Sequence, residues 1–268
     1  MLEKTKKLYE AGKLTEAIAQ LKQEVKSDPA NVGMRSFLFG LLCFNGDYES
    51  AEKQLEVISL QSASSDAGAQ VYKNVLRAEK NRNRVFHNEL QPEYLKSPPH
   101  QIKNHLDAVK AFERGETEEV LTFLNGAVQK TAPLQGKING NPFTRFADCH
   151  DLLAPILEVI IHDKYIWLPF EQIKLLQIEQ PKTLQDLIWI SARFELQDGQ
   201  VLGGYIPTRY LDSGEHPDDL VKLGRITDWK SIDENLYLGS GQRMFFVDDE
   251  EKALLEIREI NFDSIGKD

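Results

Sequence analysis

The residues that could bind a metal ion gather near the middle of the sequence. Cys149, His150, Glu158 and His162 lie close together, and zinc is bound in proteins by cysteine, histidine and carboxylate side chains. If residues 151–162 form a helix, as we predict, Glu158 and His162 are four positions apart and share one face. Neither a paired-histidine zincin spacing nor a cysteine pair accompanies them in the sequence. The simpler interpretation is a polar helix edge with a satisfied histidine, and a small metal-dependent hydrolase is kept as an alternative function.

Nucleophilic and phosphate-binding sites are less well supported by the spacing. Cys149 and His150 are adjacent, so in an extended segment their side chains point to opposite faces and cannot exchange a proton directly. Gly239 and Gly241 precede Arg243, but the strand-like "RMFFVDD" follows where a phosphate loop needs a helix, and this favours a turn. A G-x-S-x-G elbow and a Walker lysine are both missing from the sequence. We therefore expect no enzyme and no cofactor, with a nucleotide-binding enzyme as part of the same alternative.

Aromatic and arginine side chains of the second half could instead bind a protein partner. Arginine pairs bidentately with carboxylates, and buried aromatic residues dominate the energetics of interfaces. The competing interpretation is a structural role, because "KYIWLP" is apolar on both faces and reads as a strand between two layers. The candidate partner contacts in this half are Trp167, Phe170, Arg209, Tyr210, Trp229 and Arg243.

Composition restricts the classes of partner. The chain has 268 residues, of which 41% are hydrophobic, and its 32 basic and 42 acidic side chains give a net charge of −10. Such a charge disfavours nucleic acid and anionic membrane as partners. Two cysteines cannot build a disulfide framework, and no apolar stretch approaches the roughly 20 residues that span a bilayer. We expect a cytoplasmic protein without direct membrane insertion.

An internal repeat organises the first half. "LYEAGKLTEAIAQL" from Leu8 aligns on "LCFNGDYESAEKQL" from Leu42 with an offset of 34, which places Gly12 on Gly46 and a small alanine at the same later position in each. This period resembles the tetratricopeptide repeat, a pair of helices joined at a glycine turn. A weaker echo follows Gly115, and a long helix is expected over residues 66–87. Residues 1–130 are thus predicted to form a helical solenoid of about five to seven helices.

The inward face of such a solenoid is a candidate docking surface. In the second repeat the inward positions are Ser36, Gly40, Cys43 and Phe44, which are mostly small. Small residues permit the close approach of a partner peptide or helix. They would equally allow a downstream helix of the same chain to lie there, and the sequence leaves both possibilities open.

The second half reads as a separate α+β domain. Pro and Gly are frequent in residues 131–140, which we predict to be a linker, and residues 141–268 form the second domain. Besides the helix at 151–162, strand-like runs occur at "KYIWLP", "DLIWISARFEL", "GGYIPTRYL", "RMFFVDD" and "ALLEIREINF". Asp198 and Gly199 suit a tight hairpin turn between two of them. The predicted fold class is α+β, an N-terminal TPR-like α-helical solenoid followed by a small mixed α/β C-terminal domain.

Five blocks of the second half resemble one known family. "LLAPILEVIIHDKYIWLPFEQIK", "TLQDLIWISA", "YIPTRY", "LGRITDW" and "LGSGQRMFFVDDEEKALLEIREI" are similar in order and wording to the ImpE family of bacterial type VI secretion. The resemblance implies a cytoplasmic adaptor that binds the N-terminal segment of the small contractile-sheath subunit and is associated with the AAA+ ATPase that recycles contracted sheath. It brings no catalytic residues. A generic TPR chaperone for an unrelated client remains a further alternative.

Overall fold

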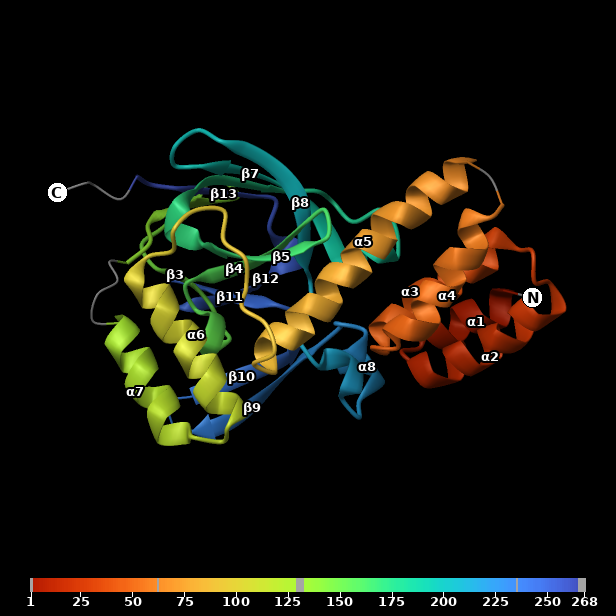
Figure 1. Cartoon of the computed structure of the whole chain (residues 1–268), viewed down its shortest axis with the longest axis horizontal. Coiled ribbons are helices and arrows are strands. Elements are labelled where there is room, and N and C mark those ends of the chain that lie inside the picture. The colour runs from red at the N-terminus through yellow and green to blue at the C-terminus, as the bar shows by residue number, and fades with distance from the viewer. Residues whose placement is uncertain (1, 62, 129–132, 235, 265–268) are drawn as a thin grey trace.

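The computed structural model describes residues 2–61, 63–128, 133–234 and 236–264 (Figure 1). Helices fill the first part of the chain and strands the second, so the α+β fold class is confirmed. Within the described residues up to 128 the helices are α1 (Leu2–Glu10), α2 (Leu14–Ser27), α3 (Val32–Phe44), α4 (Tyr48–Ser59), α5 (Ala63–Phe86), α6 (His100–Glu113) and α7 (Thr117–Val128).

Helices α1 to α4 form the two pairs that the repeat predicts. The turns of both pairs contain a glycine with positive φ, +78° at Gly12 and +73° at Gly46, a conformation that other residues rarely adopt. Ala17 and Ala51 are fully buried where the helices of each pair cross. Alanine suits this position because a larger side chain would hold the helices apart. Gly115, with a φ of +76°, marks a third helix pair, α6 and α7.

Helix α5 connects the repeats to the sheet. Its observed bounds, Ala63–Phe86, agree with the helix predicted over residues 66–87. Figure 1 shows α5 running from the α1–α4 stack across the sheet, with α6 and α7 beside the sheet at its far end. The third helix pair therefore packs against the sheet-rich half, and the extent of the solenoid stays a prediction.

Three antiparallel sheets make up the rest of the described structure. The largest has eight strands in the order β2-β1-β13-β6-β7-β8-β4-β5, the second pairs β9 with β10, and the third has the order β12-β11-β3. Their bounds are β1 (Gly136–Ile138), β2 (Asn141–Phe143), β3 (Phe146–Asp148), β4 (Ile156–Ile161), β5 (Lys164–Pro169), β6 (Ile173–Ile178), β7 (Trp189–Leu196), β8 (Val201–Pro207), β9 (Thr227–Asp233), β10 (Leu236–Gly241), β11 (Met244–Val247), β12 (Glu250–Ala253) and β13 (Glu259–Phe262). A short helix, α8 (Asp219–Lys222), precedes β9.

Several predicted strands are confirmed. The run "KYIWLP" is β5, and it is buried on both faces as its composition indicates, since Trp167 belongs to the core shared with the helices and Leu168 to the core of the sheet-rich half. Strands β7 and β8 form the predicted hairpin, and Gly199 in its turn has a φ of +86°. β1 begins at Gly136, inside the predicted linker, of which residues 131 and 132 lie outside the described residues. The domain limits stay a prediction.

The helix predicted over residues 151–162 is wrong. Asp151–Leu153 form a single 3₁₀ turn, η1, and residues 156–161 are strand β4. The sequence "ILEVII" is rich in β-branched residues, and its consecutive buried positions suit a strand between two layers better than a helix with one apolar face. His162 lies in the exposed turn after this strand with a φ of +57°, so it shares no helix face with Glu158.

Candidate functional site

A cluster of buried charges joins α5 to the sheet-rich half. Its members, which we call the buried charge cluster, are Glu79 and Arg82 from α5, Asp148 from β3, Glu158 from β4, and Arg243. Arg82 donates from Nε and Nη2 to the two Glu158 oxygens at 2.7 and 2.9 Å. Arg243 donates from Nη1 to Asp148 at 2.7 Å and from Nη2 to Glu158. Glu158 thus lies between two arginines from distant parts of the sequence.

Neutral side chains complete the hydrogen bonding of this cluster. The Tyr165 hydroxyl donates to Glu158, and the Tyr210 hydroxyl donates to Asp148 at 2.8 Å. The Trp167 indole donates to the Tyr165 hydroxyl at 2.7 Å, and the Trp189 indole donates to Glu79 at 2.9 Å. Since each carboxylate oxygen of Asp148 and Glu158 already accepts a donor, the cluster fixes the packing of α5 and offers no unoccupied base.

The pKa values of the two central carboxyl groups diverge. Burial alone would raise the pKa of Glu158, but Arg82 and Arg243 outweigh it and lower this pKa to about 2. Burial raises the pKa of Asp148 to about 6, although Arg243 opposes the shift. Removing one partner of such a buried ion pair lowers the free energy of unfolding by about 3–5 kcal/mol, because the other charge is left uncompensated. The cluster therefore holds the helical and sheet-rich halves together.

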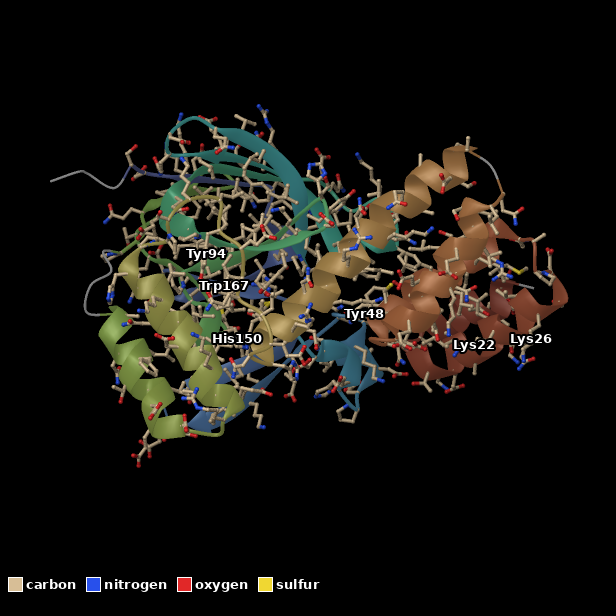
Figure 2. The ribbon with its side chains drawn as sticks, in the orientation of Figure 1. Lys22, Lys26, Tyr48, Tyr94, His150 and Trp167 are labelled. Carbon is tan, nitrogen blue, oxygen red and sulfur yellow. The ribbon has the colours of Figure 1, made fainter. Side chains whose placement is uncertain are left out.

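The metal-binding candidates lie in different surroundings, because Cys149 and His150 are buried and His162 is exposed in the turn after β4. Burial raises the pKa of the Cys149 thiol, and burial lowers the pKa of His150 to about 4. Figure 2 labels His150 and Trp167, which lie among the strands and helices and not on the outline of the molecule. Within the part of the chain that the structure describes, no group of three or more His, Cys, Asp and Glu residues is arranged to hold a metal ion. The Glu158 carboxylate accepts its hydrogen bonds from Arg82, Arg243 and Tyr165.

Two arginines of the sheet-rich half bind equivalent backbone atoms of the two repeats. Arg225 donates to the carbonyl oxygens of Tyr9 and Glu10 at 2.6 and 2.8 Å. Arg209 donates to the carbonyl oxygens of Cys43 and Phe44 at 3.0 and 2.8 Å. These acceptors are 34 residues apart, which is the period of the repeat. Each pair of carbonyls ends the first helix of a repeat, where a cation is favoured by the helix dipole.

The same half of the molecule also caps a helix of the first repeat. Asp47 accepts from the Ser50 amide and so caps α4 with its own side chain, whereas the equivalent position before α2 is Lys13, which makes no such bond. Asp219 supplies the missing acceptor, because its carboxylate accepts from the Thr15 amide at 2.9 Å and from the Thr15 hydroxyl at 3.0 Å. An aspartate more than 200 positions away thus replaces a local N-cap.

The inward face of the second repeat is covered by the chain itself. A Cβ atom on Gly40 would lie 2.5 Å from the Leu184 side chain, and Gln185 donates to the Ser36 carbonyl at 3.3 Å. The carbonyls of Cys43 and Phe44 are bound by Arg209. Of the two possibilities that the sequence leaves open, the structure displays the intramolecular one. The covering segment is a loop with a 3₁₀ turn, η3 (Gln185–Leu187), and not a helix.

The other predicted contact residues are mostly interior. Trp167, Phe170 and Arg243 have no exposed surface, Tyr210 is 2% exposed and Arg209 is 6% exposed, while Trp229 is partly exposed beside the Tyr210 ring. Partner contact through these residues, or through the inward face, stays a prediction that would need the present packing to open. Gly239 and Gly241 lie in strand β10, so the turn predicted at these residues is wrong. A Cβ on Gly239 would meet the Tyr210 ring at 2.5 Å, and packing explains that glycine.

A hollow that the sequence did not indicate lies between α7 and β11. We call it the α7–β11 groove; it measures about 810 Å³ and is lined mainly by apolar side chains. In β11 Phe245 is fully buried, whereas Phe246 lines the groove and is 43% exposed. Its apolar lining includes Leu121, Leu124, Phe146, Ala147, Pro155 and Phe246.

Comparisons with known proteins agree with this architecture. A family model described as "ImpE protein" matches residues 140–261, and a tetratricopeptide repeat model matches residues 8–79. The type VI secretion system accessory component TagJ of Pseudomonas aeruginosa is 35% identical over 256 residues, which cover 96% of this chain and 90% of that protein. The crystal structure of protein VPA1032 from Vibrio parahaemolyticus has a TM-score of 0.89 at 22% identity, with 97% of each chain covered, and shows the same fold.

The chain is thus a two-part protein, in which a tetratricopeptide-like helical stack precedes an ImpE-type antiparallel sheet region. The extent of the likeness to the Pseudomonas protein then identifies the family: the chain belongs to the ImpE family of type VI secretion accessory components. This confirms the resemblance drawn from the five sequence blocks. Among the described residues, no helix is both long and apolar enough to cross a membrane.

Proposed function

We propose that this chain is a non-enzymatic, cytoplasmic adaptor of a bacterial type VI secretion system. Its partner is the N-terminal segment of the small contractile-sheath subunit, and through it the adaptor is linked to the AAA+ ATPase that recycles contracted sheath. The observation that carries the proposal is the 35% identity to an accessory component of type VI secretion over 96% of this chain. A tetratricopeptide repeat in the same chain supports a protein as the partner.

The polar chemistry of the interior supports an adaptor in preference to an enzyme. The carboxylates of Asp148 and Glu158 are fully buried and saturated with donors. Catalytic groups must reach a substrate, and a general base must accept its proton. An apolar groove such as the one beside α7 is also a surface on which a peptide segment can bind.

The test is a binding measurement with purified proteins. The full chain is mixed with the small sheath subunit, with the same subunit lacking its N-terminal segment, and with that segment as a synthetic peptide. Calorimetry should detect binding to the intact subunit and to the peptide, and none to the truncated subunit. Equal binding of intact and truncated subunits, or binding to neither, would exclude the proposed partner.

A further inference from the structure

We propose that a pocket at the junction of the two halves binds a small molecule with a carboxylate at one end and a cation at the other. This is the chemistry of a basic amino acid such as arginine or lysine. The junction pocket, as we call it, measures about 540 Å³ and is formed by the turn of the second repeat, by α5 and by the loop that follows β8. The inference does not rest on the sheath partner, because no described residue lines both this pocket and the α7–β11 groove.

The walls of the junction pocket are held in place by direct contacts between the two halves. A Cβ atom on Gly214 would lie 2.7 Å from the Gly46 amide nitrogen, so the loop after β8 lies against the backbone of the repeat turn. Arg82 of α5 donates to the Arg209 carbonyl oxygen of the same loop at 3.0 Å. Figure 2 labels Tyr48, which lies where the repeats meet α5. A ligand in this pocket would contact all three elements at once.

Two hydrogen-bond donors at the inner end of the pocket lack an acceptor. Arg209 is 6% exposed, and its Nε has no hydrogen-bond partner within the described residues. Its other nitrogens donate to carbonyl oxygens and not to a carboxylate. The Tyr48 hydroxyl also forms no hydrogen bond in the described part of the chain. Burial and Glu79 raise the pKa of this hydroxyl, while Arg209 opposes the shift only in part, so the hydroxyl keeps its proton. A carboxylate oxygen is the acceptor that both groups lack.

The mouth of the pocket carries carboxylates without a basic partner. Asp212 and Glu215 line it and are exposed, and among the described residues neither forms an ion pair with a lysine or arginine. Burial and Glu215 raise the pKa of Asp212, because the second carboxylate disfavours its charge. The basic residues of the same rim, Lys80 and Arg84, are already paired with other glutamates. A cation on the ligand would therefore be attracted to the mouth.

The charges of the lining favour a basic amino acid over a simple anion or cation. Four basic and five acidic side chains line the pocket, so their formal charges sum to −1. A simple anion is repelled at the mouth, and a simple cation leaves the inner donors without an acceptor. Arginine and lysine carry one net positive charge at neutral pH and suit both ends. Their methylene chains can pack between the ends on Ile188, Pro207 and Tyr210.

The experiment measures the binding of L-arginine to the full chain by isothermal titration calorimetry, with agmatine and L-glutamate as comparisons. Agmatine is arginine without its carboxylate, so it should bind at least about tenfold more weakly, as expected for lost hydrogen bonds to a charged group. L-Glutamate places a second carboxylate at the acidic mouth and should also bind at least about tenfold more weakly. Absence of arginine binding, or equal affinity for arginine and either comparison, would overturn the proposal.

Variants assign each end of the ligand to its wall. Tyr48→Phe removes one inner donor and should weaken arginine binding about tenfold, while agmatine binding stays within about twofold of the wild type. The double variant Asp212→Asn, Glu215→Gln should weaken both ligands about fivefold to tenfold. Asparagine suits the first position because it tolerates the φ of +59° found there.

A matched control removes two carboxylates far from the pocket. Glu56→Gln with Asp66→Asn changes exposed residues near the end of α4 and the start of α5, and should leave both affinities within about twofold. Equal weakening in this control would reveal a general charge effect and refute the site. Unchanged arginine affinity in Tyr48→Phe and in the Asp212, Glu215 double variant would place the ligand elsewhere and refute it as well. Circular dichroism of each variant verifies that the fold is retained, and none of these outcomes depends on binding of the sheath subunit.

Discussion

The turns of the two repeats receive the same arginine contact in different surroundings. At the second turn Arg209 is 6% exposed, stacks on the Phe44 ring at 5.0 Å, and donates as well to the Lys222 carbonyl that ends α8. At the first turn Arg225 is exposed and stacks on the Tyr9 ring, also at 5.0 Å. The recognised atoms are backbone carbonyls, so one geometry serves two repeats whose side chains at the turn differ. Burial then decides how much each contact contributes.

The first repeat, which lacks a local N-cap on its second helix, receives that cap from the sheet-rich half. The second repeat caps its own helix with Asp47, but the first repeat has Lys13 at that position and depends on Asp219. The sheet-rich half therefore supplies both a C-terminal cation and an N-terminal acceptor to the first repeat. We infer that the first repeat loses order more readily when the two halves separate.

Arg209→Met should cause the largest loss of stability among these contacts. The change leaves the Phe44 and Lys222 carbonyls without a donor, whereas the Cys43 carbonyl keeps the Gly46 amide at 3.2 Å. Each unpaired group costs about 2 kcal/mol, or roughly 4 kcal/mol together. Urea unfolding measures the difference. Arg225→Met is the matched control, with an expected loss below about 1 kcal/mol because water can reach the Tyr9 carbonyl. Equal losses in the two variants would contradict the role assigned to burial.

Acid should lower the free energy of unfolding through His105, which belongs to neither repeat turn. Burial lowers the pKa of His105 from 6.5 to about 4, so the folded state favours the neutral ring. The resulting stability is complete above pH 6.5 and is lost as the pH falls through about 4, and it amounts to roughly 3 kcal/mol. The wild type should therefore lose about that much more stability than His105→Asn between pH 7 and 4. Parallel pH profiles of the two proteins would refute this assignment.

Asp219→Ala should have a smaller effect that a second change removes. Loss of an N-cap acceptor costs about 1 kcal/mol. Lys13→Asp gives α2 the local cap that Asp47 gives α4, so in that background Asp219→Ala should cost markedly less. A double-mutant cycle from thermal unfolding measures the coupling. If the two changes are additive, Asp219 acts through something other than the cap of α2.

The sequence predicts local structure where one pattern controls it. The 34-residue offset places Gly12 and Gly46 in their turns, and the doubly apolar "KYIWLP" gives β5. The stretch 151–162 is mispredicted because leucines and isoleucines spaced as in a helix also fit a fully buried strand, and only the contacts of Glu158 with two distant arginines reveal its place. The spacing between Arg209 and Arg225 also does not predict that they bind carbonyls one repeat apart. The two arginines reach equivalent positions of the repeats only when the chain folds.

For the same reason, the sequence does not determine which of these residues contact a partner. An arginine or aromatic residue after a turn is compatible with a partner contact and with a buried structural contact, and Arg243 has no exposed surface in the structure. The groove beside α7 depends on which side of β11 each phenylalanine faces. That choice is fixed by the pairing of β11 with β3 and β12, which join segments far apart in the sequence.

Hydrogen exchange of the full chain, with and without the peptide from the sheath subunit, is the most direct test of the proposed binding. Slower exchange on binding is expected in α7 and β11, which border the groove, and no change in α3, whose inward face the chain already covers. Slower exchange in α3 together with faster exchange around Leu184 and Gln185 would contradict it, because the partner would then have displaced the covering loop from the repeats.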